Sequence, residues 1–145
     1  MKKLFIAALF AATAVFAQGI HWEKDFKHAL VRAKQLHKPI FFVYSRHSCK
    51  WCRHLESTTF RDPRVIAALN GSFVNVVSYT DENDYTPRKL MLPGTPGLWF
   101  LDSSGEPMFQ PVQGAVGASD LLRAIRIVEK EFDKRAMRQR YGNKR

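Results

Sequence analysis

The sequence predicts a single α/β domain in which helices flank a central mixed β-sheet. Residues 40–44 (IFFVY) and 73–79 (FVNVVSY) are continuous runs of apolar, β-branched and aromatic residues, which is typical of strands buried on both faces. Amphipathic helical patterns precede, separate and follow these runs, and such an alternation favours a sheet covered by helices. A chain of 145 residues is long enough for one domain with its own core.

The first half of the chain contains three predicted helices. The first has an apolar residue at every third or fourth position and ends at Lys38-Pro39. Its apolar face comprises Trp22, Phe26, Ala29, Leu30, Ala33 and Leu36. The second begins near Cys49 and runs through WCRHLEST. The third begins at Asp62-Pro63, a capping residue followed by proline in the first turn, and ends at Asn70-Gly71.

The second half is predicted to hold a loop, a hairpin and a helix. Residues 80–97 are polar and then proline-rich, so they indicate a loop. The segments LWFLD and PMFQPV flank SSGE and indicate a β-hairpin, with Trp99 in the core. A last helix begins at Ser119. Its apolar face comprises Leu121, Leu122, Ile125, Val128 and Phe132.

The N-terminus has the pattern of a secretory signal peptide. A short basic start precedes fourteen apolar residues, and Val15 and Ala17 form a small-residue cleavage site before Gln18. A permanent membrane anchor is disfavoured because a spanning helix needs about 20 apolar residues. No cysteine lies near the cleavage site to carry a lipid. We expect a signal peptide at 1–17 and a single exported domain at 18–145, periplasmic in a Gram-negative organism.

The charge balance is strongly basic, and it limits the classes of binding partner that we expect. The formal net charge is +10, and removal of the signal peptide with its two lysines lowers it to +8. This favours anionic surfaces or acidic proteins as partners. No nucleic-acid-binding motif is present, so we expect no nucleic-acid partner. The basic C-terminal tail, residues 134–145, is predicted to be a solvated helix end or a weak contact for anionic lipid or an acidic redox partner.

The two cysteines of the chain, Cys49 and Cys52, form a C-x-x-C pair. A structural zinc site needs four ligands, and His47 and His54 do not supply a second pair at standard spacing, so we expect no metal. Covalent haem attachment requires histidine after the second cysteine, where this chain has Arg53. A structural disulfide would close a very short loop and restrain the unfolded chain little.

Thiol–disulfide exchange uses the spacing directly. At a helix start, Cys49 would meet unpaired backbone N–H groups and the positive end of the helix dipole, which favour its thiolate. Lys50, Arg46 and Arg53 add positive charge nearby. Cys52, one turn inside, would resolve the mixed disulfide. An oxidising compartment allows such a pair to cycle, and no cofactor is needed because the two thiols carry both electrons.

The segments around these cysteines resemble a known family. Residues 38–74 (KPIFFVYSRHSCKWCRHLESTTFRDPRVIAALNGSFV) and 94–107 (GTPGLWFLDSSGEP) are similar to the thioredoxin fold. The similarity is greatest to the C-terminal periplasmic domain of the membrane thiol:disulfide interchange reductases and to their soluble exported relatives. It extends from about Trp22 to Leu122, most of the chain after the predicted signal peptide.

The resemblance implies roles for individual residues. Cys49 would be the nucleophile and Cys52 the resolving cysteine. Pro96 would be a cis-proline lying against the disulfide, and the backbone of Thr95 would pair with an extended substrate segment.

The chain departs from the family pattern at three places. Ser48 stands where thioredoxins usually carry tryptophan, and Lys50-Trp51 is neither the Gly-Pro of thioredoxin nor the Pro-His of the strong oxidant. Val43 replaces a buried acid that assists proton transfer. Proton transfer is therefore assigned to water, Glu56 or a histidine, and the direction of electron flow cannot be inherited.

Three aromatic side chains near the cysteines each have two interpretations. His47 and His54 either tune the thiolate and accept its proton or are exposed polar positions. Trp51 either contacts the peptide of a partner or packs against the fold.

These observations predict an exported thiol–disulfide oxidoreductase. We expect it to reduce protein disulfides, or relay electrons to them, and to be recharged by a membrane or soluble redox partner that donates electrons. A disulfide oxidase, an isomerase and a non-catalytic binding module for an apoprotein or a metal are the alternatives. The predicted site comprises Cys49, Cys52, Lys50, Trp51, Thr95, Pro96, His47, His54 and Glu56.

Overall fold

The computed structural model describes residues 19–142. The predicted signal peptide at 1–17 and the last three residues of the basic tail lie outside this range. The α-helices are α1 (Phe26–Leu36), α2 (Lys50–Ser57), α3 (Pro63–Ser72) and α4 (Ala118–Gly142). The strands are β1 (Ile40–Ser45), β2 (Val74–Tyr79), β3 (Gly97–Leu101) and β4 (Val112–Gln113), and two short 3-10 turns are η1 (Thr59–Arg61) and η2 (Arg88–Leu90).

The four strands form one mixed sheet in the order β2-β1-β3-β4. The central strand β1 is parallel to β2 and antiparallel to β3, and β4 is antiparallel to β3. Five of the six residues of β1 are buried, because both faces of the sheet are covered. The predicted central mixed sheet flanked by helices is therefore confirmed.

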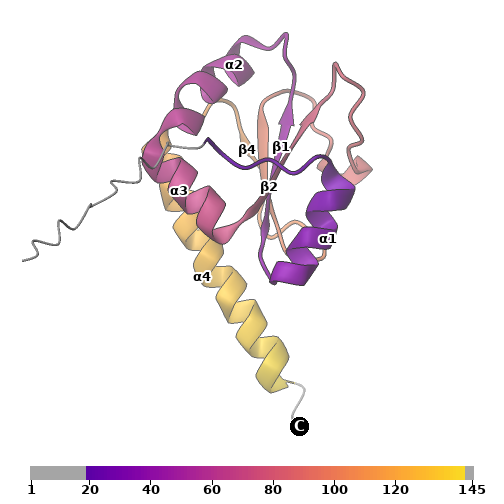
Figure 1. Ribbon diagram of the computed structural model, residues 1–145, viewed down its shortest axis with the longest axis vertical. Helices are drawn as coiled ribbons and strands as arrows, with labels where there is room; N and C mark the ends of the chain where they lie inside the picture. The colour runs from indigo at the N-terminus through magenta and orange to yellow at the C-terminus, as the bar shows by residue number, and fades with distance from the viewer. Residues whose placement is uncertain (1–18, 143–145) are drawn as a thin grey trace, which may run out of the picture.

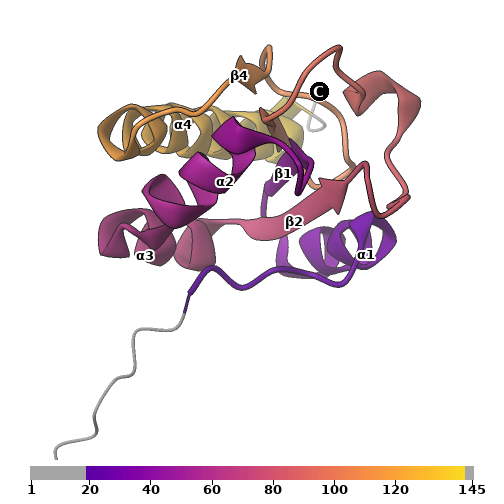
Figure 2. The same ribbon diagram turned by 90° about the horizontal axis from the view of Figure 1, so that it is seen from above.

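Alternate side chains of the strands enter two separate hydrophobic clusters. Ile40 and Phe42 pack with Phe26, Ala29 and other residues of the α1 side. Phe41 and Val43 point to the opposite face, where the cluster is completed from α2, α3 and α4 by Leu55, Val65, Leu69, Leu121, Ile125 and Val128. Figure 1 shows α1 on one side of the sheet and α3 and α4 on the other, and Figure 2 shows the same layers from above.

The first helix starts later than the sequence pattern predicts. Asp25 caps α1 by accepting the backbone N–H of His28 at 2.8 Å, so the helix begins at Phe26. Trp22, which the periodicity placed on the helix, lies instead in an extended segment that bridges to Asn75 beside β2. Its ring packs against Phe41 and Phe60 on the opposite face of the sheet from α1.

Two other boundaries differ from the prediction. Helix α3 does not end at Asn70-Gly71 but continues to Ser72, because neither residue has the left-handed backbone that ends a helix. The Asn70 side chain bonds instead to the backbone of His21 and Gly19. The hairpin turn after β3 is present, with Leu101 bridged to Pro107. Its second arm is not a continuous strand, because prolines lack the N–H donor that a ladder needs.

Helix α4 confirms the predicted last helix and Trp99 lies in the core, 7% exposed. The C-terminal end of α4 extends beyond the sheet layers, at the opposite end of the molecule from the start of α2 (Figure 1). Within residues 19–142 no helix has both the length and the apolar character that a membrane span requires.

Candidate active site

The two cysteines lie at the start of α2, directly after the carboxyl end of the central strand. Cys49 is the N-cap residue of the helix, with an extended backbone, and its Sγ accepts the backbone N–H of Cys52 at 3.2 Å. Cys49 is partly exposed, whereas Cys52, one turn inside, is 1% exposed. The helix start thus presents one thiol to solvent and buries the other.

The surroundings shift the pKa values of the two thiols in opposite directions. Burial alone would raise the pKa of Cys49, but hydrogen bonds with Cys52 and Thr95 outweigh it and hold the pKa below the ordinary value of 9.0. Burial raises the pKa of Cys52, and the hydrogen bond with Cys49 raises it further. At a given pH the exposed sulfur therefore has the larger thiolate fraction.

The loop before β3 closes over the exposed thiol. The Cys49 thiol donates to the Thr95 carbonyl oxygen at 3.5 Å, and the Thr95-Pro96 peptide bond is cis. Pro96 is buried, and its carbonyl oxygen accepts the N–H of Gly114 next to β4. The structure thus brings the carbonyl oxygen of Thr95 to Cys49, and Pro96 follows it in the same loop.

An acidic side chain after β2 holds the turn that leads into α2. The Asp81 carboxylate accepts the backbone N–H groups of His47 and Ser48, each at 3.1 Å. Arg53, from α2, donates to the carbonyl oxygen of His47 at 2.8 Å. Arg46 donates to the Thr80 hydroxyl at 3.2 Å. The turn before Cys49 is therefore anchored to the segment after β2, and these two arginines are engaged with loop oxygens.

His47 lies between an acid and an aromatic ring. Its Nε2 is 2.8 Å from Glu82, and its ring stacks on Tyr79 with centroids 3.8 Å apart. Both contacts join the loop before α2 to the end of β2. Glu82 and Tyr79 therefore both fix the position of the His47 ring, two residues before Cys49.

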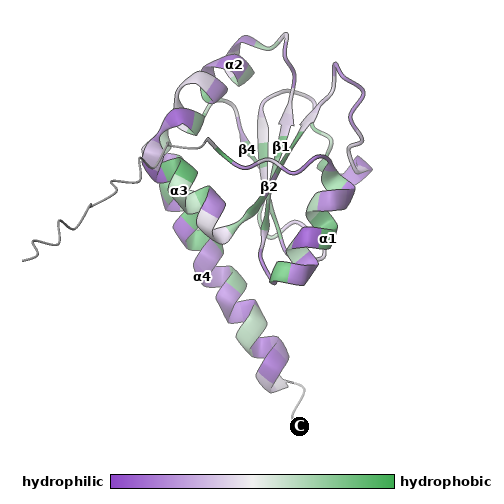
Figure 3. Ribbon diagram, viewed as in Figure 1, coloured by the Kyte–Doolittle hydropathy of each residue, from purple (hydrophilic) through white to green (hydrophobic). Residues whose placement is uncertain are grey.

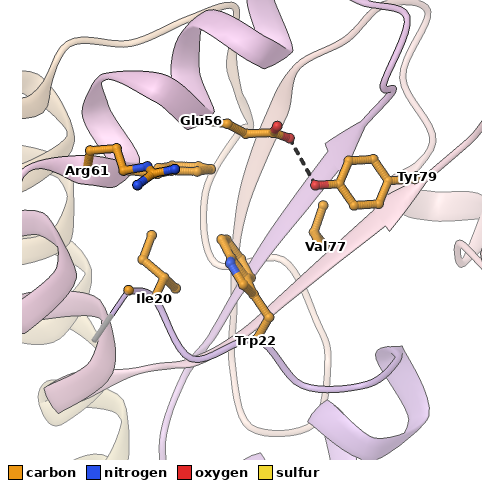
Figure 4. Close-up of a pocket in the computed structure, with 8 residues that line it drawn as sticks. Ile20, Trp22, Glu56, Arg61, Val77 and Tyr79 are labelled. Carbon is orange, nitrogen blue, oxygen red and sulfur yellow. Dashed lines mark hydrogen bonds between the residues drawn. The ribbon is translucent and has the colours of Figure 1, made fainter. Parts of the chain in front are cut away.

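Glu56 lines a cavity of about 280 Å³ beside α2. The Tyr79 hydroxyl donates to the Glu56 carboxylate at 3.0 Å, as the dashed line in Figure 4 shows. Burial and this acid both raise the pKa of Tyr79. Trp22 and Arg61 line the same cavity (Figure 4). Glu56 follows Cys52 by one turn of α2, so both residues lie on one side of that helix.

The residues between and beyond the cysteines form an exposed group. Trp51 is 57% exposed, which excludes the interpretation that it packs into the fold. The Lys50 ammonium lies 5.6 Å from the centroid of the Trp51 ring. The His54 ring packs edge-on against the Trp51 ring, with centroids 5.8 Å apart. These three side chains therefore form part of the protein surface next to Cys49 and do not belong to the core below the cysteines.

Sequence reasoning missed Ser45, Tyr79 and Asp81. Ser45 ends β1 and hydrogen-bonds with Cys52, which lowers the pKa of that thiol against the effect of burial. Tyr79 ends the parallel strand β2, and Asp81 follows it. The signal was available, because residues after neighbouring parallel strands meet at the same edge of the sheet. Within residues 19–142 no group of three or more His, Cys, Asp or Glu side chains is arranged to hold a metal ion.

This protein is of the thiol–disulfide oxidoreductase class. The features that place it there are the topology of the sheet, the thiol pair at a helix start and the Thr-Pro loop beside that pair. A family model described as a thioredoxin-like domain matches residues 26–129. This chain therefore belongs to the thioredoxin-like domain family.

Individual known proteins show the same fold. A thioredoxin from Thermus thermophilus matches with a TM-score of 0.65 at 22% identity, over 77% of this chain and 88% of that one. The reduced C-terminal domain of DsbD from Neisseria meningitidis matches with a TM-score of 0.54 at 20% identity, over 69% and 90%. Spermatogenesis-associated protein 20 of Rattus norvegicus is 26% identical over 99 residues, which are 66% of this chain but 12% of that protein.

Proposed function

We propose that this protein is an exported oxidoreductase that reduces disulfides of other proteins, or relays electrons to them, through Cys49 and Cys52. The observation that carries the proposal is the division of the two thiols at the start of α2. The exposed Cys49 has a lowered pKa and accepts an N–H hydrogen bond, whereas the buried Cys52 has a raised pKa. A nucleophile must be ionised and accessible, and a resolving thiol must stay protonated until it is needed.

The reaction follows from this division. The Cys49 thiolate attacks one sulfur of the substrate disulfide and forms a mixed disulfide, and the other substrate sulfur leaves as a thiolate that takes up a proton. The Cys52 thiol then loses its proton and attacks the Cys49 sulfur. The second substrate thiolate leaves and is protonated, and a Cys49–Cys52 disulfide remains. Two electrons and two protons have passed to the substrate.

The proton of Cys52 needs an acceptor at the second step. Val43, at the position of the acid used in related proteins, cannot accept it. Glu56 lies one turn further along α2, on the same side of the helix as Cys52, and its carboxylate is held by Tyr79. His47 is engaged by Glu82 and Tyr79, and His54 is exposed beside Trp51. We assign the acceptor role to Glu56, directly or through water.

Partners and location belong to the same proposal. The oxidised protein must be reduced again by an electron-donating redox partner, in a membrane or in solution. Export to the periplasm, or to another oxidising compartment, is supported by the basic start and apolar run of residues 1–17. The direction of electron flow is the part of the proposal that the reduction potential decides.

Equilibration with glutathione redox buffers, followed by trapping of free thiols, tests the proposal. A reduction potential near about −270 mV would support a reductase, and one near about −120 mV would indicate an oxidant instead. The C49A and C52A variants are controls, since neither can form the internal disulfide. If the wild-type protein forms no reversible Cys49–Cys52 disulfide, the proposal of an oxidoreductase is wrong. A non-catalytic binding module is then the interpretation that remains.

A further inference from the structure

Five exposed side chains form a line along the outer side of α4. They are Ile127, Lys130, Lys134, Met137 and Tyr141, and we call them the α4 stripe. Their spacing alternates between three and four residues, which places all five on one side of a helix. Ile127 and Met137 are each 54% exposed and Tyr141 is 72% exposed. Two lysines thus lie between Ile127 and the pair Met137 and Tyr141, along a surface that no described part of the protein covers.

The stripe lies opposite the side of α4 that packs against the sheet. The buried residues of this helix are Leu121, Ile125 and Val128. At about 100° per residue they point roughly 180° away from the stripe. The core therefore does not account for the apolar members of the stripe. The last part of α4 also extends past the sheet layers, and it is mostly hydrophilic (Figures 1 and 3).

The charge around the stripe is predominantly positive. Residues 134–142 contain four basic side chains and no acidic one. Arg126 and Arg138 flank the stripe and are exposed. Among the described acids of α4, Asp120 pairs with Arg123 at 3.2 Å and Glu131 pairs with Arg135 at 3.1 Å. Asp133 is exposed beside the stripe and forms no salt bridge within residues 19–142.

We propose that the α4 stripe binds the surface of a membrane containing anionic lipids, with α4 lying in the interface. Lysines hold anionic headgroups while their stems cover apolar surface, and tyrosine favours the boundary between water and acyl chains. The convex outer side of a single helix suits a broad surface. An acidic protein would require a complementary contour, and a second copy of α4 would place Lys130 and Lys134 against like charges.

The proposed attachment uses a different element from the thiol pair. The α4 stripe contains no residue of α2, whose start lies at the opposite end of the molecule from the C-terminal end of α4 (Figure 1). The inference concerns attachment, and it does not depend on the direction or existence of the redox reaction.

Co-sedimentation of the exported protein, residues 18–145, with lipid vesicles tests the inference, because the basic and apolar segment 1–17 could itself bind anionic vesicles. The probes are phosphatidylcholine vesicles with and without phosphatidylglycerol. We expect binding only to the anionic vesicles, and loss of binding at high salt because surface attraction is screened. The K130E/K134E variant should bind at least about tenfold more weakly, since each basic residue near an anionic surface contributes on the order of 1 kcal/mol.

Two further variants distinguish binding through the α4 stripe from binding through the overall positive charge of the protein. K27E/K34E makes the same charge change on exposed residues of α1 and should bind like the wild type. M137S/Y141S keeps every charge and should bind several-fold more weakly. The inference is overturned by three results: no binding of the wild type to anionic vesicles, equal loss in both lysine variants, or a stripe-dependent complex with a second copy or an acidic protein in the absence of lipid.

Discussion

The imidazole ring of His47 stacks on the phenol ring of Tyr79, with centroids 3.8 Å apart and an angle of 15° between the planes. One ring comes from the turn before α2 and the other from the end of β2. The Asp81 carboxylate reinforces this contact by accepting the N–H groups of His47 and Ser48. The position of Cys49 at the helix start therefore depends on residues about thirty positions further along the chain.

Replacing Asp81 should loosen the turn that leads into α2. In D81A the N–H groups of His47 and Ser48 lose their acceptor, so we expect faster amide hydrogen exchange at both positions and a lower melting temperature. The D133N variant, which removes an exposed carboxylate from α4, is the matched control. Unchanged exchange at His47 and Ser48 in D81A would show that the carboxylate does not hold the turn.

The two thiols should differ in their reactivity toward an alkylating agent as the pH is raised. A lowered pKa moves the appearance of thiolate to lower pH, so the pH profile of Cys49 should rise below the ordinary thiol value of 9.0. Cys52 should remain unmodified in the folded protein until higher pH, because its pKa is raised and it is buried. Mass spectrometry after timed iodoacetamide treatment distinguishes the two sites. Simultaneous labelling would contradict the proposed division of roles.

Stability at low pH should depend on Asp62, which caps α3. Hydrogen bonds from the Arg64 side chain and backbone lower the pKa of Asp62 from 3.8 to about 2. A lowered pKa means that the stabilising contribution is complete above about pH 3.8 and is lost as the pH falls through about 2. Urea unfolding between these values should show a decline in the wild type that is shallower in D62N. Parallel declines in the two proteins would assign the effect to other carboxylates.

Trp51 should contribute to partner binding and little to folding. Because it is 57% exposed, W51A should change the free energy of unfolding by less than about 0.5 kcal/mol. An aromatic side chain buried at an interface contributes about 2 kcal/mol, so KM for a protein disulfide should rise about thirtyfold. The rate with a small aromatic disulfide reagent should stay the same. Y141A, which removes an exposed aromatic ring from α4, is the control. It should leave both the KM for the protein disulfide and the rate with the small reagent unchanged.

Local sequence predicted much of the candidate site. The C-x-x-C pair and the preceding apolar strand were recognisable because each depends on residue types at fixed spacing, and the Thr95-Pro96 loop was recognisable through the resemblance to the thioredoxin fold. The contacts that join these parts were not predicted. Asp81 and Tyr79 are ordinary polar residues in the sequence, and they meet the turn before α2 only when β1 and β2 lie side by side.

The sequence by itself determined the elements whose pattern has a single solution. The run IFFVYS is buried on both faces in β1, and the Asp62-Pro63 start of α3 carries its own cap. The tertiary structure decided where short segments of ambiguous pattern lie. Trp22 has a spacing compatible with helix, yet it pairs with Asn75, and the Asn75 side chain also donates to the carbonyl oxygens of His21 and Leu69. Periodicity reports which side chains favour burial, but the partner that buries them is selected by contacts distant in sequence.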